Sequence, residues 1–150
     1  MKLHRVLLGC VGLTVIIGLL QVAGSWAAGD TASAPRLVLK GHDPVAYFTA
    51  GKPVKGSENL GYVWDGGRYW FANEKNRAQF VSAPDRYAPQ FAGFCTGGMS
   101  INEKIEADPM QWKIVEGKLY VFSSPSFRKR APPELAGTIV LAEKHWPKLK

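Results

Sequence analysis

Residues 62–71 read Tyr-Val-Trp-Asp-Gly-Gly-Arg-Tyr-Trp-Phe and carry the clearest secondary-structure pattern in the chain. Two aromatic-rich runs flank Asp-Gly-Gly, a composition typical of a tight hairpin turn that needs positive φ. Residues 112–115 and 119–122 repeat this arrangement around residues 116–118, so a second hairpin is predicted there.

Helix signals lie between and around the two hairpins. Asn73 is a predicted N-cap for a helix over residues 74–82, which Pro84 prevents from continuing. The pair Asp43-Pro44 predicts a single helical turn, because Asp caps and Pro suits the first helical position. The pair Asp108-Pro109 repeats that signature. A short apolar run, residues 37–39, is a predicted first strand.

The C-terminal part is predicted to be helical. Ser124-Pro125 and Pro133-Glu134 both resemble helix starts, and residues 135–146 form the predicted C-terminal helix, ended by Pro147. The predicted class is α+β: a small antiparallel sheet built from β-hairpins, with short helices packed on it and a C-terminal helix. No fixed-period repeat is visible, and the two Asp-Pro sites do not extend into one.

The N-terminal stretch has the pattern of a targeting signal. Residues 1–5 are basic, residues 6–20 are uncharged and apolar, and small residues follow, which predicts a signal peptide over residues 1–27 with cleavage near Ala27/Ala28. The expected location is periplasmic or secreted, with residues 28–35 as a flexible lead-in. The alternative is a membrane anchor over residues 6–24, which approaches the length of a bilayer span.

Charge argues against one class of partner. The 150-residue chain has a formal net charge of +7, but the excess is spread out, and its one cluster, residues 128–130, is short. A nucleic-acid interface would need a basic stripe and a recognisable module. Solubility and general attraction to anionic surfaces explain the charge better; no nucleic-acid partner is expected.

Cleavage would leave Cys95 as the only cysteine. Because an exported protein usually pairs its cysteines, a single one is a buried thiol, a metal ligand, a reactive group or a site of intermolecular pairing. Gly93, Gly97 and Gly98 indicate a tightly shaped turn around it.

Three stretches together resemble the exported single-domain branch of the YHS domain family: residues 41–48, residues 69–87 and residues 92–95. Residues 146–149 add to the likeness, which spans roughly residues 36–149 and implies one YHS-like domain over residues 36–150. The resemblance implies heavy-metal binding through cysteine thiolates. At the matching positions this chain has Ala46, Ala72 and Asn76, none of which carries a thiol. The resemblance therefore supports the fold better than it supports metal binding.

The candidate metal ligands are therefore Cys95, His42 and Met99, with Met110 as a further thioether. Thiolate and thioether ligands suit a soft transition metal such as copper, Cu(I). The alternatives are that His42 is a loop histidine, that Cys95 is packed among neighbouring aromatic residues, and that the methionines fill the core.

The candidate ligand-binding residues are Asp43, Tyr47 and Phe94. Three hypotheses follow from these candidates. The first is an exported binding or accessory domain that takes a soft metal through Cys95 and His42. The second is a metal-free small-molecule or protein-binding module in which Cys95 is structural. Strand alternation then leaves some aromatic residues facing a groove, out of a set expected mostly in the core: Tyr47, Tyr62, Trp64, Tyr69 and Trp70. The third is a Cys-dependent enzyme with His42 as base, although no cysteine-hydrolase signature is present and a non-enzyme is favoured.

Overall fold

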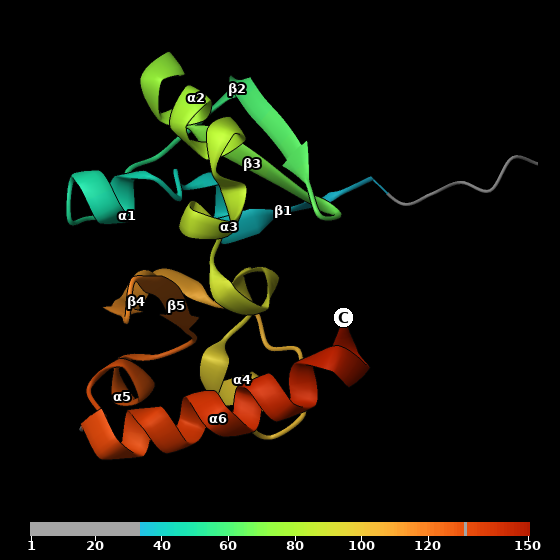
Figure 1. Ribbon diagram of the computed structural model, residues 1–150, viewed down its shortest axis with the longest axis vertical. Coiled ribbons are helices and arrows are strands. Elements are labelled where there is room, and N and C mark those ends of the chain that lie inside the picture. The colour runs from blue at the N-terminus through green and yellow to red at the C-terminus, as the bar shows by residue number, and fades with distance from the viewer. Residues whose placement is uncertain (1–33, 131) are drawn as a thin grey trace, which may run out of the picture. The chain divides into compact units, whose positions relative to one another are not determined.

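The computed structural model describes residues 34–130 and 132–150. The predicted signal peptide, and the lead-in before Ala34, lie outside these residues. Residues 33–150 form one compact unit, and its α+β class confirms the prediction (Figure 1). None of the helices in the described ranges is both long enough and apolar enough to cross a membrane.

Two sheets are present rather than one. The first has the strand order β1-β3-β2, in which β3 pairs antiparallel with β2 and parallel with β1. The second is the antiparallel pair β4-β5. The strands are β1 (Arg36–Leu37), β2 (Ser57–Trp64), β3 (Gly67–Phe71), β4 (Asp108–Val115) and β5 (Lys118–Phe122). Both predicted hairpins are confirmed.

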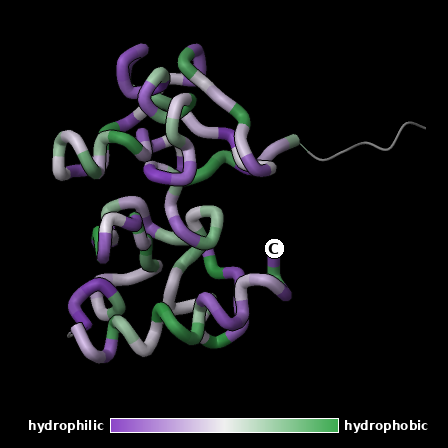
Figure 2. Tube along the Cα trace, in the orientation of Figure 1, coloured by the Kyte–Doolittle hydropathy of each residue, from purple (hydrophilic) through white to green (hydrophobic). Residues whose placement is uncertain are grey.

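Helices lie before and after each hairpin. They are η1 (Val38–Gly41), α1 (Ala46–Thr49), α2 (Glu74–Ser82), α3 (Pro84–Tyr87), η2 (Gln90–Gly93), α4 (Thr96–Ser100), α5 (Pro125–Arg128) and α6 (Pro132–Leu149). Asn73 caps α2 as predicted, since its side chain accepts from Asn76 N. Along α6 polar and apolar residues alternate (Figure 2), and the buried ones are Leu135, Thr138, Ile139 and Ala142.

The predicted first strand is only partly formed, and the Asp108-Pro109 signature does not begin a helix. β1 ends at Leu37, because Leu39 and Lys40 take left-handed backbone angles (φ 52° and 49°) that turn the chain into η1. Asp108 begins β4, and its Oδ1 accepts the Met110 N–H in a local turn (2.9 Å), so the capping interaction forms without a helix.

The predicted helix ends are also corrected. Pro147 lies inside α6 rather than ending it, and the Lys150 N–H still reaches Trp146 O at 2.9 Å. A proline so close to a C-terminus removes one hydrogen bond but leaves little helix after it to disrupt. The Asp43 helix begins later than predicted, at Ala46.

The structure contains an internal repeat that the sequence does not reveal. We call residues 36–82 the first module and residues 89–149 the second module. In each, a left-handed turn ending in glycine precedes a short helix and then a hairpin, and the φ values agree closely: 52°, 49° and 76° over residues 39–41, and 55°, 50° and 79° over residues 91–93. The hairpin turns match as well, with φ 43° and 72° at residues 65–66 and 50° and 73° at residues 116–117.

Strand pairing outside the turns is also equivalent in the two modules. Leu37 pairs parallel with Arg68 in the first module, and Pro89 forms a parallel bridge with Leu119 in the second. Both hairpins contain a register shift at the same point of their long strands, β2 and β4. The two modules are therefore variations on one supersecondary unit, and the second ends in the long helix α6.

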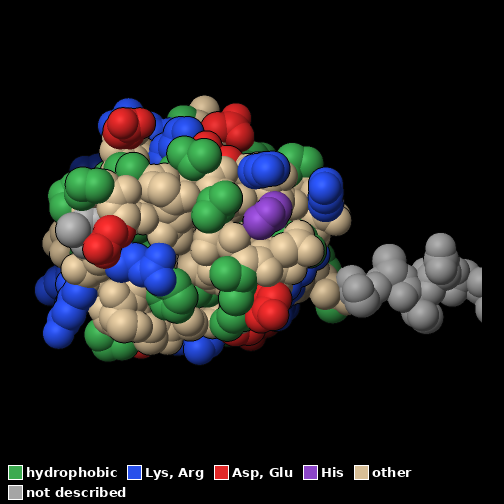
Figure 3. All heavy atoms as spheres, turned by 90° about the horizontal axis from the view of Figure 1, so that it is seen from below, with side chains coloured by type: hydrophobic (Ala, Val, Ile, Leu, Met, Phe, Trp, Pro, Cys, Tyr) green, Lys and Arg blue, Asp and Glu red, His purple; other side chains and the backbone are tan. Residues whose placement is uncertain are grey.

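The core is formed by buried side chains from both sheets, from the short helices and from α6. Its largest members are aromatic or aliphatic side chains with almost no exposure: Tyr47, Phe71, Phe80, Phe122, Met99 and Leu119. The face seen in Figure 3 carries hydrophobic side chains scattered among charged and polar ones rather than gathered in one patch.

Candidate functional site

Cys95 is buried inside the second module. It is 0% exposed and is the N-cap of α4, where its Sγ accepts the Gly98 N–H at 3.4 Å. The same sulfur accepts the Ser123 N–H at 3.1 Å, and the thiol lies 3.3 Å from Ser123 Oγ, to which it donates. The thiol thus fastens the start of α4 to the residue that follows β5.

Asp43 is buried to the same degree in the first module. Its carboxylate is 0% exposed and accepts three hydrogen bonds: from Val45 N (2.9 Å), Ala72 N (2.9 Å) and the Asn76 side-chain amide (2.6 Å). A buried carboxylate is tolerated only when its oxygens are paired in this way. Asp43 was predicted as a ligand-binding residue and as a helix cap; the structure gives its carboxylate structural contacts.

Asp43 and Cys95 occupy equivalent positions in the two modules. Each follows the glycine of its left-handed turn by two residues, and each donates its own N–H across the turn, to Val54 O (2.9 Å) and Ile105 O (2.8 Å) respectively. Ala72 and Ser123, whose N–H groups they accept, are both the first residue after the final hairpin strand. The Cys95 sulfur and the Asp43 carboxylate therefore have the same role: each binds the residue that follows the hairpin of its own module.

His42 belongs to the first module, whereas Cys95 belongs to the second. The imidazole Nδ1 of His42 lies 3.0 Å from Leu39 O, and its backbone bridges to Lys55. The equivalent of His42 in the second module is Phe94, which bridges to Glu106. No hydrogen bond between His42 and Cys95 is found within the described ranges.

The predicted thioether ligands differ in exposure. Met99 is 0% exposed and packs in the core on α4, while Met110 is 51% exposed on β4. Within residues 34–130 and 132–150, no group of three or more His, Cys, Asp or Glu side chains could hold a metal ion. A site there would have to rest on fewer such ligands.

Tyr47 and Phe94 complete the predicted set. The Tyr47 hydroxyl donates to Pro109 O at 3.1 Å, and its ring packs edge-on to Trp112. Burial, helped by the nearby negative charges of Asp108 and Asp43, raises the pKa of the Tyr47 hydroxyl above its ordinary value. The Phe94 ring lies under the Arg36 guanidinium, 4.1 Å from the ring centroid.

A cavity of about 240 Å³ lies at the boundary of the two modules, and we call it the seam cavity. Each module contributes a pair of aromatic rings to its wall. Trp64 and Tyr69 come from the first hairpin, with centroids 6.4 Å apart, and Phe91 and Trp146 come from η2 and α6, with centroids 6.0 Å apart.

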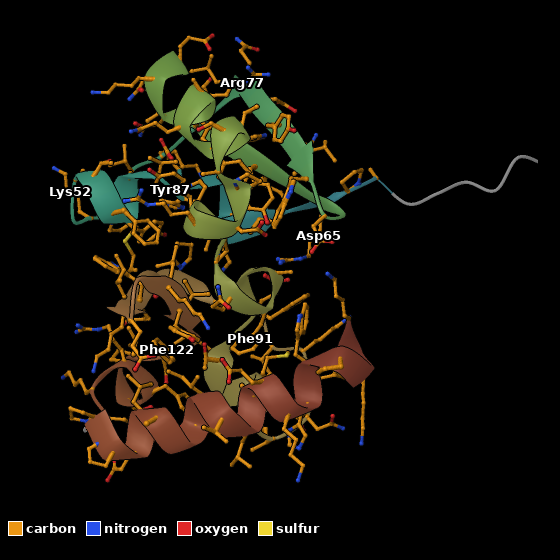
Figure 4. All side chains as sticks on the ribbon, in the orientation of Figure 1. Lys52, Asp65, Arg77, Tyr87, Phe91 and Phe122 are labelled. Carbon is orange, nitrogen blue, oxygen red and sulfur yellow. The ribbon has the colours of Figure 1, made fainter. Side chains whose placement is uncertain are left out.

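Polar groups complete the wall of the seam cavity: Asp65 in the β2–β3 turn, Asp85 on α3 and Gln90 at the start of η2. Figure 4 shows Asp65 at the hairpin turn and Phe91 below it, on the side where α6 ends. Asp65 is ion-paired with Lys150 at 2.8 Å. The described residues contain no such partner for Asp85.

Tyr69 is the most buried of the four aromatic residues, at 2% exposure. Burial is the main reason that the pKa of its hydroxyl is raised to about 12. The negative charge of Asp65 adds to the rise, and the positive charge of Arg36 opposes it. None of the described side chains is hydrogen-bonded to this hydroxyl. Tyr69 contributes to the wall of the seam cavity.

A second cavity of about 290 Å³ adjoins the first and shares Asp65, Ala92 and Trp146 with it. We call it the adjoining cavity. Its character is basic, since Arg36, Lys104 and Lys150 contribute to its wall. Of the predicted ligand-binding residues, Phe94 lines it.

Sequence reasoning anticipated part of this wall. Of the five hairpin and helix aromatics expected mostly in the core with some facing a groove, Trp64 and Tyr69 line this cavity. Asp65, Asp85, Phe91 and Trp146 were not predicted as site residues, because they become neighbours only when the second module and α6 fold against the first. No local pattern connects them.

Comparison with known proteins gives no further guide: no protein-family model, curated protein or solved structure matches the chain.

Proposed function

We propose that this protein is an exported binding or accessory module that takes a small molecule at the seam cavity, with Cys95 in a structural role. The observation that carries the proposal is the aromatic wall of that cavity, to which both modules contribute. Small-molecule sites are concave, mostly apolar and lined by aromatic side chains with a few polar groups. The seam cavity shares the concave form and the aromatic lining, and polar groups make up about as much of its wall as apolar ones.

The size of the cavity limits the ligand. Sites for drug-sized molecules usually measure about 300–1,000 Å³, and the seam cavity measures about 240 Å³. The proposed ligand is therefore a small molecule or a small head group of a larger one. A larger ligand would extend toward the adjoining cavity past Trp146.

The contacts of Cys95 support the structural role. Its sulfur is buried and accepts two backbone N–H groups, which leaves it poorly placed for attack on a substrate or for an external ion. The soft-metal hypothesis, with Cys95, His42 and Met99 as ligands, and the Cys-dependent enzyme remain predictions, and the thiol and copper measurements described below decide between them and the structural role.

Titrating the full chain with a set of small aromatic and aliphatic fragments, monitored by backbone amide NMR shifts, tests the proposal. We expect shifts to cluster at Asp65, Ala92 and Trp146, and Trp146→Leu to weaken binding by about tenfold, as truncating a central aromatic contact does. Trp112→Leu is the matched control, since Trp112 is also half-buried but lies outside the cavity wall. Fragments that shift no residue of the seam contradict the proposal.

Export is the other part of the proposal and rests on the pattern of residues 1–27. Mass spectrometry of the protein recovered from the extracytoplasmic fraction should show a mature N-terminus near Ala28. Recovery only from the membrane with residues 6–24 intact would favour the anchor.

A further inference from the structure

We infer that the seam cavity is selective for a small organic cation, such as a substituted ammonium group. The inference rests on the proposed function, because it names the chemical class of ligand for the same cavity. It is carried by the combination of aromatic rings, carboxylates and an unpaired phenol in one wall.

The aromatic rings provide the first argument. Cations are attracted to the faces of aromatic rings, most strongly to Trp, within about 6 Å of the centroid. The seam cavity has two Trp, one Tyr and one Phe side chain in its wall. Enclosing an ammonium group between aromatic rings is the usual way in which proteins recognise quaternary ammonium ligands.

Charge provides the second argument. The wall contains two carboxylates, Asp65 and Asp85, and neither lysine nor arginine. Lys150 neutralises Asp65 at 2.8 Å, whereas Asp85 has no ion pair among the described residues. The chain as a whole carries a net charge of +7, so the two carboxylates of the wall are opposite in sign to the net charge of the protein.

A second cation close to the seam cavity, Arg36, is also engaged elsewhere. Arg36 forms an ion pair with Glu106 (3.2 Å), donates to Ala92 O and stacks on Phe94. Arg36 lines the adjoining cavity with two further cations, Lys104 and Lys150, and is absent from the wall of the seam cavity. The two cavities differ in electrostatic character although they share part of one wall.

The wall favours an organic cation over a metal ion. Metal ions such as Mg²⁺ or Ca²⁺ need several oxygen ligands, and no group of three or more His, Cys, Asp or Glu side chains in the described part of the chain is suitably arranged. A weakly hydrated ammonium group gains instead from aromatic contact. The Tyr69 hydroxyl has no hydrogen-bond partner among the described residues, and Tyr69 is part of the cavity wall, so the hydroxyl can bond a polar substituent on the ligand.

Two probes of matched shape test the inference on the full chain: choline, and its uncharged isostere 3,3-dimethyl-1-butanol. Both are titrated while the amide shifts of Asp65, Ala92 and Trp146 are followed. We expect both to shift these residues and choline to bind about tenfold more tightly, since cation–π contacts in a partly desolvated site reach that range. This comparison needs no variant and cannot fail through unfolding.

Two variants then test which carboxylate strengthens the binding of choline. Asp85→Asn should weaken choline binding by about three- to tenfold, from loss of one nearby charge, and leave binding of the alcohol unchanged. Glu116→Gln is the matched control, because Glu116 holds the place of Asp65 in the second hairpin turn and does not line the seam cavity. It should alter neither titration.

The outcomes separate this inference from the proposed function. Equal affinity for choline and the alcohol at the seam overturns selectivity for cations but leaves the seam as a binding site. Choline that shifts no seam residue overturns the inference, and the fragment titration then decides whether the cavity binds any small molecule.

Discussion

The thiol of Cys95 and the carboxylate of Asp43 are equivalent groups in a repeated structural unit. Each accepts the backbone N–H of the residue that follows its own hairpin, at 3.1 Å from Ser123 and 2.9 Å from Ala72. A residue that sequence reasoning treats as a ligand or nucleophile is thereby explained as an anchor. The first module uses a buried carboxylate for the same purpose.

Cys95→Ala should destabilise the protein by about 1–3 kcal/mol, because the buried N–H groups of Gly98 and Ser123 lose their acceptor. Urea denaturation of the full chain, followed by tryptophan fluorescence, measures the loss. Cys95→Ser is the control, since a hydroxyl can still accept and should recover part of the stability. An alanine variant as stable as the wild type would show that the sulfur anchors nothing.

The structural role of Cys95 also predicts its reactivity. A thiol-specific reagent should modify it only as fast as the protein opens, because the side chain is 0% exposed. Stabilising the protein should therefore slow modification, and urea should accelerate it. Fast modification of the folded protein, below neutral pH, would favour the Cys-dependent enzyme instead.

Copper binding should not depend on Cys95. We expect Cu(I) titration under reducing conditions to give the same stoichiometry and affinity for the wild type and Cys95→Ala, since the sulfur is committed to Ser123 and Gly98. His42→Gln provides the parallel comparison for the other predicted ligand. Loss of a bound equivalent in either variant would support the soft-metal hypothesis.

Alkaline pH should destabilise the fold through its buried tyrosines. The pKa values of Tyr69 and Tyr120 are raised to about 12, in both cases mainly by burial, whereas an unfolded tyrosine titrates near 10. Between these values the folded state retains protons that the unfolded state has released, so the free energy of unfolding falls as pH rises from about 10 to about 12.

Tyr69→Phe tests the contribution of one hydroxyl to this pH dependence. One pKa unit corresponds to about 1.4 kcal/mol, so this variant should lose about 2 kcal/mol less stability than the wild type over that pH range. Urea denaturation at pH 9 and pH 11.5 measures the difference. If the free energy of unfolding falls as steeply with pH in the variant as in the wild type, the pKa of the Tyr69 hydroxyl is not raised by folding.

Close packing at α4 predicts opposite effects of one substitution at two helical glycines. A Cβ on Gly97 would lie 2.4 Å from the Phe127 ring, whereas a Cβ on Gly137 in α6 meets nothing within 4 Å. Gly97→Ala should therefore destabilise by about 1–3 kcal/mol, and Gly137→Ala should stabilise by about 0.5–1 kcal/mol. Thermal unfolding of both variants checks the contrast, and equal melting temperatures would contradict the packing at α4.

The sequence determines the hairpins, the capping of α2 by Asn73 and the long C-terminal helix, because each depends on residues close together in the chain. The Asp65-Gly66 turn, for example, takes positive φ at both positions, as Asp-Gly predicts. The Asp108-Pro109 pair shows where such reasoning stops: the same capping chemistry forms at the start of a strand, because pairing of Asp108 with Phe122 decides the backbone.

Only the tertiary structure decides the internal repeat and the seam cavity. Gly41 and Gly93 are the same residue in equivalent turns, but Lys40 and Ala92, or Asp43 and Cys95, share little side-chain chemistry. The repeat therefore lies in backbone angles and hydrogen bonds rather than in residue types. Trp64 and Trp146 likewise meet one cavity from opposite ends of the fold. Local sequence sets which elements form; long-range packing brings those elements together and so determines which side chains share a site.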